Sequence, residues 1–423
     1  MKFNKVLMVG LGYIGLPTAV VIAETGANVV GYDINPHVVD LINQGIPHIH
    51  EPGLINCISE VIEAGNFYAT TTPESADVFL IAVPTPFKEN HKPDIKFILD
   101  ACEAIAPCLN SGNMLILEST SPVGTTEVIA AFIAKLRPDL RVPLFSEDPN
   151  IYIAYCPERV LPGRALFELV NNDRIIGGID KQSEDFAIQF YRTFVKANCV
   201  ATNSKTAEMC KLAENSFRDV NIAFANELSM ICEELNINIW ELIKLTNLHP
   251  RVDILQPGPG VGGHCIAIDP WFIVDKSPNT AKIIRLAREV NIEKENWIVE
   301  KIRNRIQLGL IKDILFLGLS FKKNIDDLRE SPAVQIVKKI SDLTKSTQLS
   351  LKVAEPFIKE LPFDLKLNKN IKLVIGVDCI KEADLVVLLV DHDVFKNYEN
   401  LINKDKLIDT RGLFTSCFSS NSI

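Results

Sequence analysis

The sequence predicts an α/β protein with two doubly wound, Rossmann-like domains joined by a central domain of long helices. Three observations support this fold class. Short apolar strands alternate with helical segments through residues 1–203. Residues 206–235 then form a helical pattern that no proline or glycine interrupts, and strand–helix alternation resumes after residue 306. We therefore expect domains at 1–203, 204–306 and 307–423.

Composition narrows the function classes. The chain has 423 residues, of which 47% are hydrophobic and 23% charged, which is typical of a globular protein. Its net charge of -9 has no long run of one sign, so we expect no nucleic-acid partner. Glycines interrupt the N-terminal apolar run, and no apolar stretch reaches about 18 residues. We expect no signal peptide, no membrane insertion and a cytoplasmic location.

The ten cysteines are scattered, with no CxxC pair and no Cys/His cluster at zinc spacing. We expect reduced thiols and no bound metal. Nine are interpreted as packing residues: Cys57, Cys102, Cys108, Cys156, Cys199, Cys210, Cys232, Cys379 and Cys417.

The N-terminal segment has the order strand, glycine turn, helix, strand and acidic residue. Its run GLGYIG follows the expected strand 5–9, and a second strand ends just before Asp33. Gly10 would make the turn, Gly12 would let the backbone approach a pyrophosphate, and Gly15 would let helix and strand pack closely. Asp33 would accept hydrogen bonds from the ribose hydroxyls and repel a 2′-phosphate. The segment predicts a dinucleotide site that prefers NAD to NADP.

Other elements follow from apolar runs and periodicity. Further strands are expected at 76–83, 113–118, 151–154, 171–178, 313–319, 351–354, 373–375 and 385–390, and helices at 94–109, 239–247, 280–306 and 333–343. Hydroxyl residues follow the strand 113–118, in the run STSPVGTT. They suit contact with the nicotinamide half of a cofactor, or an N-cap cluster for a helix that begins near Thr126. The sequence leaves both interpretations open.

Residues 256–270, QPGPGVGGHCIAIDP, form the most unusual loop of the chain. Gly260, Gly262 and Gly263 have no Cβ, so the backbone can turn sharply and approach a bound molecule just before Cys265. The loop would present the thiol as a nucleophile. The alternative is a small buried hydrophobic residue, the usual role of an unpaired cysteine.

One face of the long helix is polar, because Glu208, Lys211, Asn215 and Arg218 recur at three- and four-residue steps. The face could be a solvated edge or part of a site. A separate apolar stripe suits a dimer seam, and its members are Phe217, Ile222, Phe224 and Leu228.

Two further cations have more than one interpretation. Arg159 could hold a phosphate or sugar, or could pair with Glu158 at the surface, and the residues alone favour the surface pair. The last domain lacks GxGxxG, which argues against a second dinucleotide site there. A nucleotide could still lie at its strand ends, beside Lys322.

Together these stretches resemble one known family. GLGYIGLP, AVPTPF, ESTSPVGTTE, YCPERVLPG, AEMCKLAENSFRDVNIAFANE, HPRVDILQPGPGVGGHC and GLSFKKNIDDLRESP occur in the order seen in the UDP-glucose/GDP-mannose dehydrogenase family. The resemblance covers about residues 5–413. It implies a homodimeric enzyme that oxidises C6 of a UDP-sugar to a carboxylate with two NAD⁺ in turn, for bacterial surface polysaccharide synthesis.

The resemblance also implies roles for single residues. Cys265 would add to the aldehyde to form a thiohemiacetal, which is then oxidised to a thioester. Lys211 and Asn215 would stabilise oxygen anions beside the reacting carbon. Asp269 would serve the hydrolytic water with Thr120 as its partner, and Glu158 would act as base.

The resemblance extends to binding residues. Substrate contacts are implied for Arg159, Val160, Lys211, Asn215, Arg218, His249, Arg251, Gly262 and Lys322. NAD contacts are implied for Gly10, Gly12, Tyr13, Ile14, Gly15, Asp33, Thr85, Thr126 and Arg329. Arg251 would reach the site of the neighbouring subunit.

Two departures separate the chain from the glucose-oxidising branch of the family. Pro162 stands where that branch often has a second glutamate, and the run from Cys265 to Asp269 lacks its lysine. Both favour a 2-acetamido sugar, whose configuration at C2 the sequence leaves open. His264 could tune the thiol or pack the loop. A two-electron alcohol dehydrogenase would not need Cys265, and a non-catalytic sensor would be expected to lose Cys265, Lys211 or Asp269.

Overall fold

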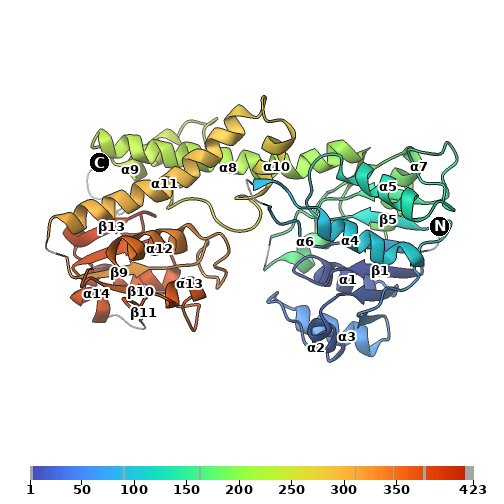
Figure 1. The fold of residues 1–423 in the computed structure, drawn as a ribbon, viewed down its shortest axis with the longest axis horizontal. Coiled ribbons are helices and arrows are strands. Elements are labelled where there is room, and N and C mark those ends of the chain that lie inside the picture. Colours follow the sequence, from blue (N-terminus) through green and yellow to red (C-terminus); the bar gives the residue numbers. More distant parts are fainter. Residues whose placement is uncertain are drawn as a thin grey trace. The chain divides into compact units, whose positions relative to one another are not determined.

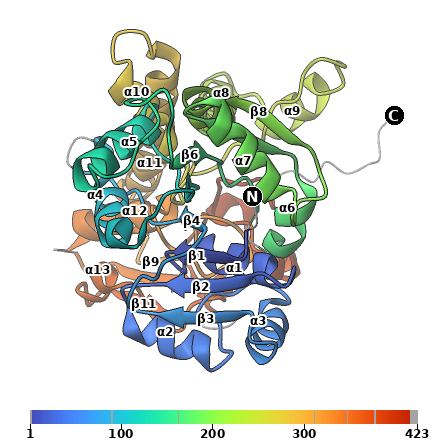
Figure 2. The ribbon, with the colours of Figure 1, turned by 90° about the vertical axis from the view of Figure 1, so that its right-hand side faces the viewer.

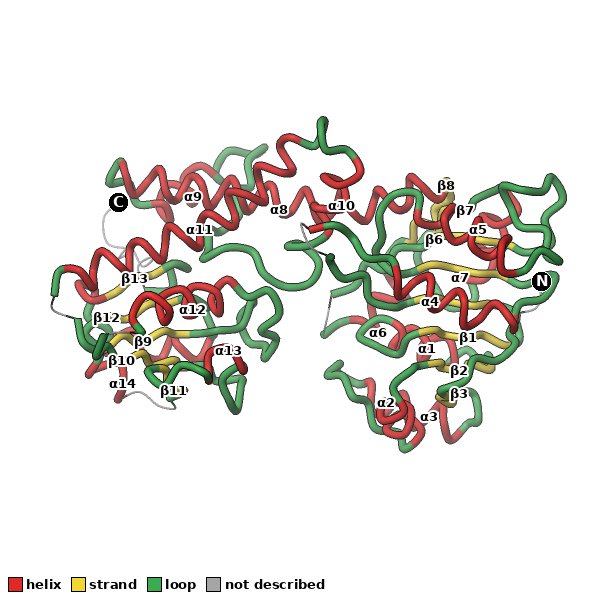
Figure 3. The backbone as a smooth tube through the Cα atoms, in the orientation of Figure 1, coloured by secondary structure: helices red, strands yellow, loops and turns green. Residues whose placement is uncertain are grey.

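A computed structural model describes residues 3–88, 91–161, 163–309, 311–345, 347–374 and 378–414 (Figures 1 and 3). The predictions for Pro162, Ile375, Cys417 and the tail after Phe414 lie outside these residues. The chain divides into two compact units, Met1–Glu214 with Trp271–Pro278 and Asn215–Pro270 with Asn279–Ile423.

The first unit contains an eight-stranded sheet. Its strands are β1 (Lys5–Val9), β2 (Asn28–Tyr32), β3 (Phe67–Thr70), β4 (Val78–Ile81), β5 (Met114–Leu117), β6 (Tyr152–Tyr155), β7 (Arg174–Gly178) and β8 (Cys199–Asn203). They lie in the order β3-β2-β1-β4-β5-β6-β7-β8, part of which can be followed in Figure 2. Neighbouring strands are parallel except β6 and β7.

Helices cover both faces of this sheet. They are α1 (Gly15–Ala23), α2 (Pro36–Asn43), α3 (Leu54–Glu63), α4 (Lys96–Ile105), the 3₁₀ turn η2 (Ala106–Cys108), α5 (Thr125–Leu136), α6 (Ala165–Asn171) and α7 (Lys181–Tyr191). Side chains alternate along each strand, so Val6 and Met8 pack with α1, α3 and α7, whereas Leu7 and Val9 pack with α4 and α5. The doubly wound class is confirmed.

The end of this sheet differs from the prediction. The expected final strand, 171–178, is β7, but β8 follows it and forms the edge of the sheet. The β8 strand is exposed or half-buried along its length. It therefore carries no buried apolar run that the sequence pattern could reveal.

The helices that follow in the described chain are α8 (Ser204–Glu234), α9 (Ile239–Thr246), α10 (Asp269–Lys276) and α11 (Lys282–Gln307). A buried polar network joins α8 to α11, because Asp219 accepts hydrogen bonds from Arg288 at 2.7 Å and from Asn291 at 2.8 Å. Asn226 continues this network and accepts from the backbone N–H of Gly258 at 2.8 Å. The network thus fixes the start of the glycine-rich loop, which Figure 3 draws in green.

The second unit contains a parallel five-stranded sheet in the order β11-β10-β9-β12-β13. Its strands are β9 (Asp313–Leu317), β10 (Ser350–Ala354), β11 (Ile371–Leu373), β12 (Leu385–Leu388) and β13 (Leu407–Asp409). Its other elements are α12 (Pro332–Thr344), α13 (Phe363–Lys366), α14 (Asp378–Glu382), η3 (Asp393–Leu401) and η4 (Lys404–Lys406). Within the described residues no helix is both long and apolar enough to cross a membrane.

Candidate functional site

The first βα turn has the geometry that a dinucleotide site needs. Gly10 has a φ of 90°, and a Cβ there would lie 2.6 Å from the carbonyl oxygen of Ala82. A Cβ at Gly15 would overlap the carbonyl oxygen of Gly10, so helix α1 can pack here only with glycine. A Cβ at Gly12 would meet no atom within 4 Å, which leaves its backbone open to a ligand.

Asp33 lies at the end of β2 and holds this turn. Its Oδ2 accepts from the N–H of Leu11 at 3.0 Å, and its Oδ1 accepts from the N–H of Asn35 at 2.9 Å. Tyr13 is 47% exposed, and Ile14 is the N-cap residue of α1. The acidic residue, the open Gly12 and the start of α1 fit NAD, whose pyrophosphate would lie at the helix N-terminus.

Hydroxyl residues meet where β4 and β5 end. The hydroxyl of Thr85 donates to the carbonyl oxygen of Thr120 at 2.6 Å. The side chain of Ser119 accepts from the N–H of Val83 at 2.9 Å. The structure thus brings Thr85, predicted to contact NAD, against Thr120, predicted to assist hydrolysis.

Glu208 on α8 caps the N-terminus of α5. Its fully buried carboxylate accepts from the N–H of Gly124 at 2.5 Å, from the N–H of Thr126 at 2.8 Å and from the Thr126 hydroxyl at 2.6 Å. The N-cap residue, Gly124, has no side chain to do this. The local N-cap cluster considered for the STSPVGTT run is therefore wrong, because the cap comes from a distant helix. The predicted NAD contact of Thr126 stays a prediction.

Glu158 is buried in the first unit, 7% exposed, and its Oε1 has no hydrogen-bond partner among the described residues. Burial raises its pKa to about 7, although the positive charges of Lys211 and Arg174 act in the opposite direction. A carboxyl group with this pKa is partly ionised at neutral pH and can exchange protons. The structure thus brings Glu158 within electrostatic reach of Lys211.

Arg159 pairs with Glu214 on α8, not with Glu158, so the predicted surface pair is wrong. Its Nη2 lies 2.7 Å from Glu214 Oε1, and its Nη1 donates to the carbonyl oxygen of Asp173 at 3.2 Å. The prediction failed because Glu158 points into the protein interior. Val160, the next residue, is half-buried against the core.

Cys265 lies four residues before helix α10 (Asp269–Lys276), in the turn that leads into this helix. It is half-buried, outside any disulfide, and its carbonyl oxygen accepts from the N–H groups of Ile268 at 3.0 Å and Asp269 at 2.9 Å. Asp269 is 3% exposed and accepts from the side-chain amide of Asn215 at 2.5 Å. The second unit thus brings together three residues predicted to be catalytic.

The glycines before Cys265 pack closely on the loop that precedes α12. A Cβ at Gly262 would lie 2.5 Å from the carbonyl oxygen of Glu330 and 2.8 Å from side-chain atoms of Phe321 and Pro332. The N–H of Gly263 donates to the carbonyl oxygen of Arg329 at 3.0 Å. No side chain fits at Gly262, so the path of the loop depends on this residue.

Lys322 lies exposed on the loop after β9, which a buried pair holds in place. Glu355 accepts from the N–H of Leu319 at 2.7 Å, and its Oε2 lies 3.0 Å from Nε2 of His392. The other ring nitrogen of His392, Nδ1, accepts from the N–H of Asn324 at 2.9 Å. Farther along this loop, Arg329 forms a 2.6 Å ion pair with Asp327.

The remaining predicted substrate residues are exposed: Arg218 on α8, and His249 and Arg251 after α9. The His249 Nδ1 accepts from the N–H of Arg251 at 3.3 Å. Within the part of the chain that the structure describes, no other hydrogen bond or ion pair fixes the side chains of these three residues. Their roles stay predictions.

Sequence reasoning missed a buried group behind Glu158. The Tyr191 hydroxyl donates to the Glu118 carboxylate at 2.6 Å. The Arg174 guanidinium lies 5.9 Å from the centre of the Tyr191 ring and donates to the carbonyl oxygen of Leu169. Glu118 and Arg174 are almost fully buried. Nothing in the local sequence indicates this, because the residues come from separate strands and a helix.

A Rossmann-type unit with this glycine turn and an acidic residue after β2 defines the class of NAD-dependent oxidoreductases. Family models give the same result. The NAD binding domain, central domain and UDP binding domain of the UDP-glucose/GDP-mannose dehydrogenase family match residues 4–195, 205–293 and 315–416. The chain belongs to the UDP-glucose/GDP-mannose dehydrogenase family, and it is an NAD-dependent dehydrogenase.

Individual relatives span nearly the whole chain. It is 56% identical to a UDP-N-acetyl-D-mannosamine dehydrogenase from Campylobacter jejuni, over 93% of this chain and 97% of the relative. It is 51% identical to an NDP-N-acetyl-D-galactosaminuronic acid dehydrogenase from Ralstonia solanacearum, over 98% of this chain and 97% of the relative. A solved structure, a UDP-D-ManNAc dehydrogenase from Pyrococcus horikoshii, superposes with a TM-score of 0.86 at 35% identity, covering 98% of this chain and 97% of the other.

Proposed function

We propose that this protein oxidises UDP-N-acetyl-D-mannosamine at C6 to UDP-N-acetyl-D-mannosaminuronate. The reaction removes four electrons through a covalent intermediate on Cys265. One observation carries the proposal: Cys265 opens a turn that places the buried Asp269 four residues later, where the Asn215 amide donates to Asp269 at 2.5 Å. A two-electron alcohol dehydrogenase has no use for a thiol at this position.

The first oxidation removes a hydride from C6 and a proton from its hydroxyl group, and the Lys211 amine would accept this proton and become the ammonium. Bound NAD⁺ supplies the hydride acceptor in this and the second oxidation. Lys211 lies one helical turn before Asn215 on α8, so the two share a face. A primary amide has two N–H donors, and Asn215 uses one on Asp269. The other, with the Lys211 ammonium, would stabilise the oxygen at C6.

The second oxidation needs a covalent bond, because an aldehyde can lose a hydride only after a nucleophile adds to it. The Cys265 thiolate would add to the C6 aldehyde, and the oxygen would take a proton to give a thiohemiacetal. Loss of a hydride from C6 and a proton from its oxygen leaves a thioester. Lys211 and Asn215 would hold this oxygen throughout.

Hydrolysis of the thioester needs a base for water. Glu158 has a pKa raised to about 7, chiefly by burial, so it can accept a proton near neutral pH. Asp269 would orient the water with Thr120. Attack on the thioester releases the carboxylate product and restores the Cys265 thiolate.

The relatives support the sugar assignment, together with the chain's departures from the glucose-oxidising branch. A second candidate, an NDP-N-acetylgalactosamine-type substrate, rests on the 51% identical Ralstonia relative. UDP-N-acetylglucosamine is a third, which differs from the mannose sugar only at C2. The product would enter bacterial surface polysaccharide synthesis, in the cytoplasm.

The proposed assembly is a homodimer built on the α8 stripe. Phe217 is 74% exposed and Phe224 58%, on a helix whose other side is buried. Large apolar side chains of this exposure support a protein contact. Arg251 would then reach the site of the neighbouring subunit. We retain the three domains 1–203, 204–306 and 307–423 as a proposal.

The test measures NADH formed per molecule of nucleotide sugar. UDP-N-acetylmannosamine, UDP-N-acetylglucosamine and UDP-N-acetylgalactosamine are run side by side at limiting concentration. Two NADH from the manno sugar and none from the others are expected. Two NADH from another epimer alone would keep the chemistry and overturn the substrate assignment, whereas one NADH per sugar would overturn the four-electron reaction.

A further inference from the structure

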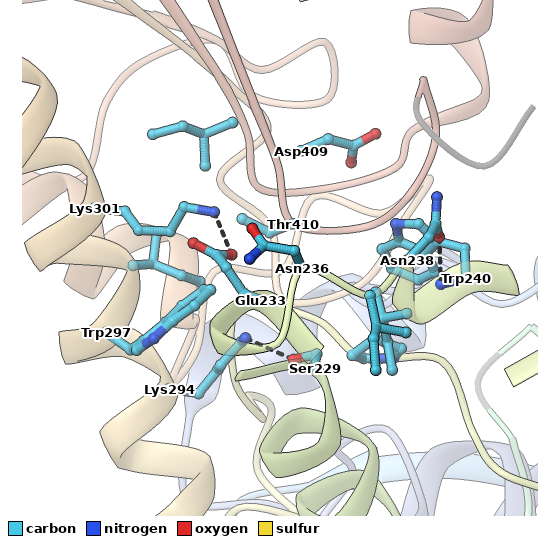
Figure 4. A pocket seen from close by; sticks show the side chains of 15 residues that line it. Ser229, Glu233, Asn236, Asn238, Trp240, Lys294, Trp297, Lys301, Asp409 and Thr410 are labelled. Atoms are coloured by element: carbon cyan, nitrogen blue, oxygen red, sulfur yellow. Dashed lines mark hydrogen bonds and ion pairs between the residues drawn. The ribbon is translucent and has the colours of Figure 1, made fainter. Parts of the chain in front are cut away.

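A cavity of about 320 Å³ lies in the second unit, apart from every residue given a role above (Figure 4). The end of α8, the α8–α9 connection, α11 and the end of β13 line it. Its volume is at the lower end of the range for small-molecule sites. It is large enough for a metabolite smaller than a nucleotide sugar.

Lys294, from α11, is the unusual residue of this cavity. It is only 4% exposed, and its Nζ donates to the hydroxyl oxygen of Ser229 at 2.7 Å and lies 3.9 Å from the centre of the Trp297 ring. No ion pair joins it to a carboxylate in the described part of the chain. A buried ammonium without a counter-ion is costly, and a bound anion would remove this cost.

The other charged groups of the cavity are already balanced. Lys301 pairs with Glu233 at 2.7 Å, as Figure 4 shows. Asp409 accepts from three backbone N–H groups that follow it, at 2.7 to 2.9 Å. The cavity therefore presents one cation, Lys294, to an incoming ligand. Ile237 and Trp240 supply an apolar wall.

We propose that this cavity binds a small organic anion, a phosphate monoester or a carboxylate, with its charged group on Lys294 and its carbon part against Ile237 and Trp240. The ammonium has three donors, and Ser229 takes one. Two remain for the anion. The site goes beyond the proposed dehydrogenase reaction and does not depend on its substrate.

Binding is coupled to protonation. Burial lowers the pKa of Lys294 to about 7, the charge of Lys301 lowers it further, and Glu233 raises it. Asp409 is the other titratable group that faces the cavity. Because only the ammonium form attracts an anion, each anion bound above pH 7 takes up close to one proton. Affinity then falls about tenfold for each pH unit above the pKa.

The experiment is calorimetric titration of the full-length enzyme with sulfate, which does not itself titrate in this range. NAD⁺ and UDP are present at saturation, so that the expected nucleotide sites are filled. Titrations in triethanolamine and in Tris, two cationic buffers whose ionisation enthalpies differ, give the number of protons taken up. We expect one sulfate per chain, nearly one proton taken up at pH 8, and about tenfold weaker binding at pH 8.5 than at pH 7.5.

Variants separate this site from general charge effects. Lys294→Met should lose binding at least tenfold, whereas Lys338→Met, at a lysine of α12 that pairs with Asp364 and does not line the cavity, should keep it. Succinate in a parallel arm tells a carboxylate site from a phosphate site by its relative affinity. Equal sulfate binding by Lys294→Met, or wild-type binding without proton uptake, would overturn the proposal, and so would no binding of either anion at tens of millimolar.

Discussion

Substituting Glu158 with glutamine should stabilise the protein at alkaline pH. In the unfolded chain this carboxyl ionises near pH 4.5, and in the folded chain burial raises its pKa to about 7. Folding therefore takes up a proton between these pH values, so stability falls from about pH 4.5 to about pH 7 and is level above that. The shift corresponds to a loss of ~3 kcal/mol at full ionisation. Glutamine does not ionise, so the variant lacks this loss.

The assay is thermal unfolding of both proteins between pH 5 and pH 9. At about 2–4 °C for each kcal/mol in a unit of this size, the difference in Tm should grow by roughly 6–12 °C in favour of the variant. Glu63→Gln, at an exposed position of α3, is the matched control and should show no such trend. A difference in Tm that is flat across this range would refute the burial argument. In turnover, the wild-type rate should rise through pH 7 and the slower variant should not show that rise.

Four further substitutions test the glycine turn, Asp33 and the contact between Asn215 and Asp269. Gly12→Ala should weaken NAD binding at least tenfold and leave the Tm unchanged, because a Cβ at this position meets only open space. Gly15→Ala should also lower the Tm by several degrees, because its Cβ would overlap the carbonyl oxygen of Gly10. Equal Tm values for the two variants would contradict this reasoning. Asp33→Ala should weaken NAD binding and reduce the preference of the enzyme for NAD over NADP. If steady-state kinetics show an unchanged preference, Asp33 does not belong to the cofactor site. Asn215→Ala removes the 2.5 Å hydrogen bond from its side-chain amide to Asp269 and the second N–H donor proposed for the oxygen at C6, so it should lower kcat about 10²-fold with a smaller change in KM. A change in KM alone would argue against the oxyanion role.

The parts of the fold that the sequence predicted best depend on local patterns. The strands β1 and β2 begin and end at the predicted residues, because a short apolar run between polar residues and glycines leaves little choice. The glycine turn was found for the same reason. Helix α8 was visible as a long stretch free of proline and glycine.

What the sequence could not predict depends on burial and long-range contacts. Glu208 was recognised only as part of a polar stripe, yet it reaches α5, 82 residues away, and its carboxylate is fully buried. Glu158 and Arg159 are adjacent, and only the tertiary structure sends one inward and the other to Glu214. The edge strand β8 has no buried face to mark it.

The covalent role of Cys265 is tested by NADH formation from UDP-N-acetylmannosamine, measured with Cys265→Ser beside the wild type. Serine keeps the size of the side chain but is a far weaker nucleophile toward the aldehyde. We predict two NADH per sugar for the wild type and no sustained turnover for the variant. Two NADH per sugar from Cys265→Ser at the wild-type rate would contradict the covalent mechanism.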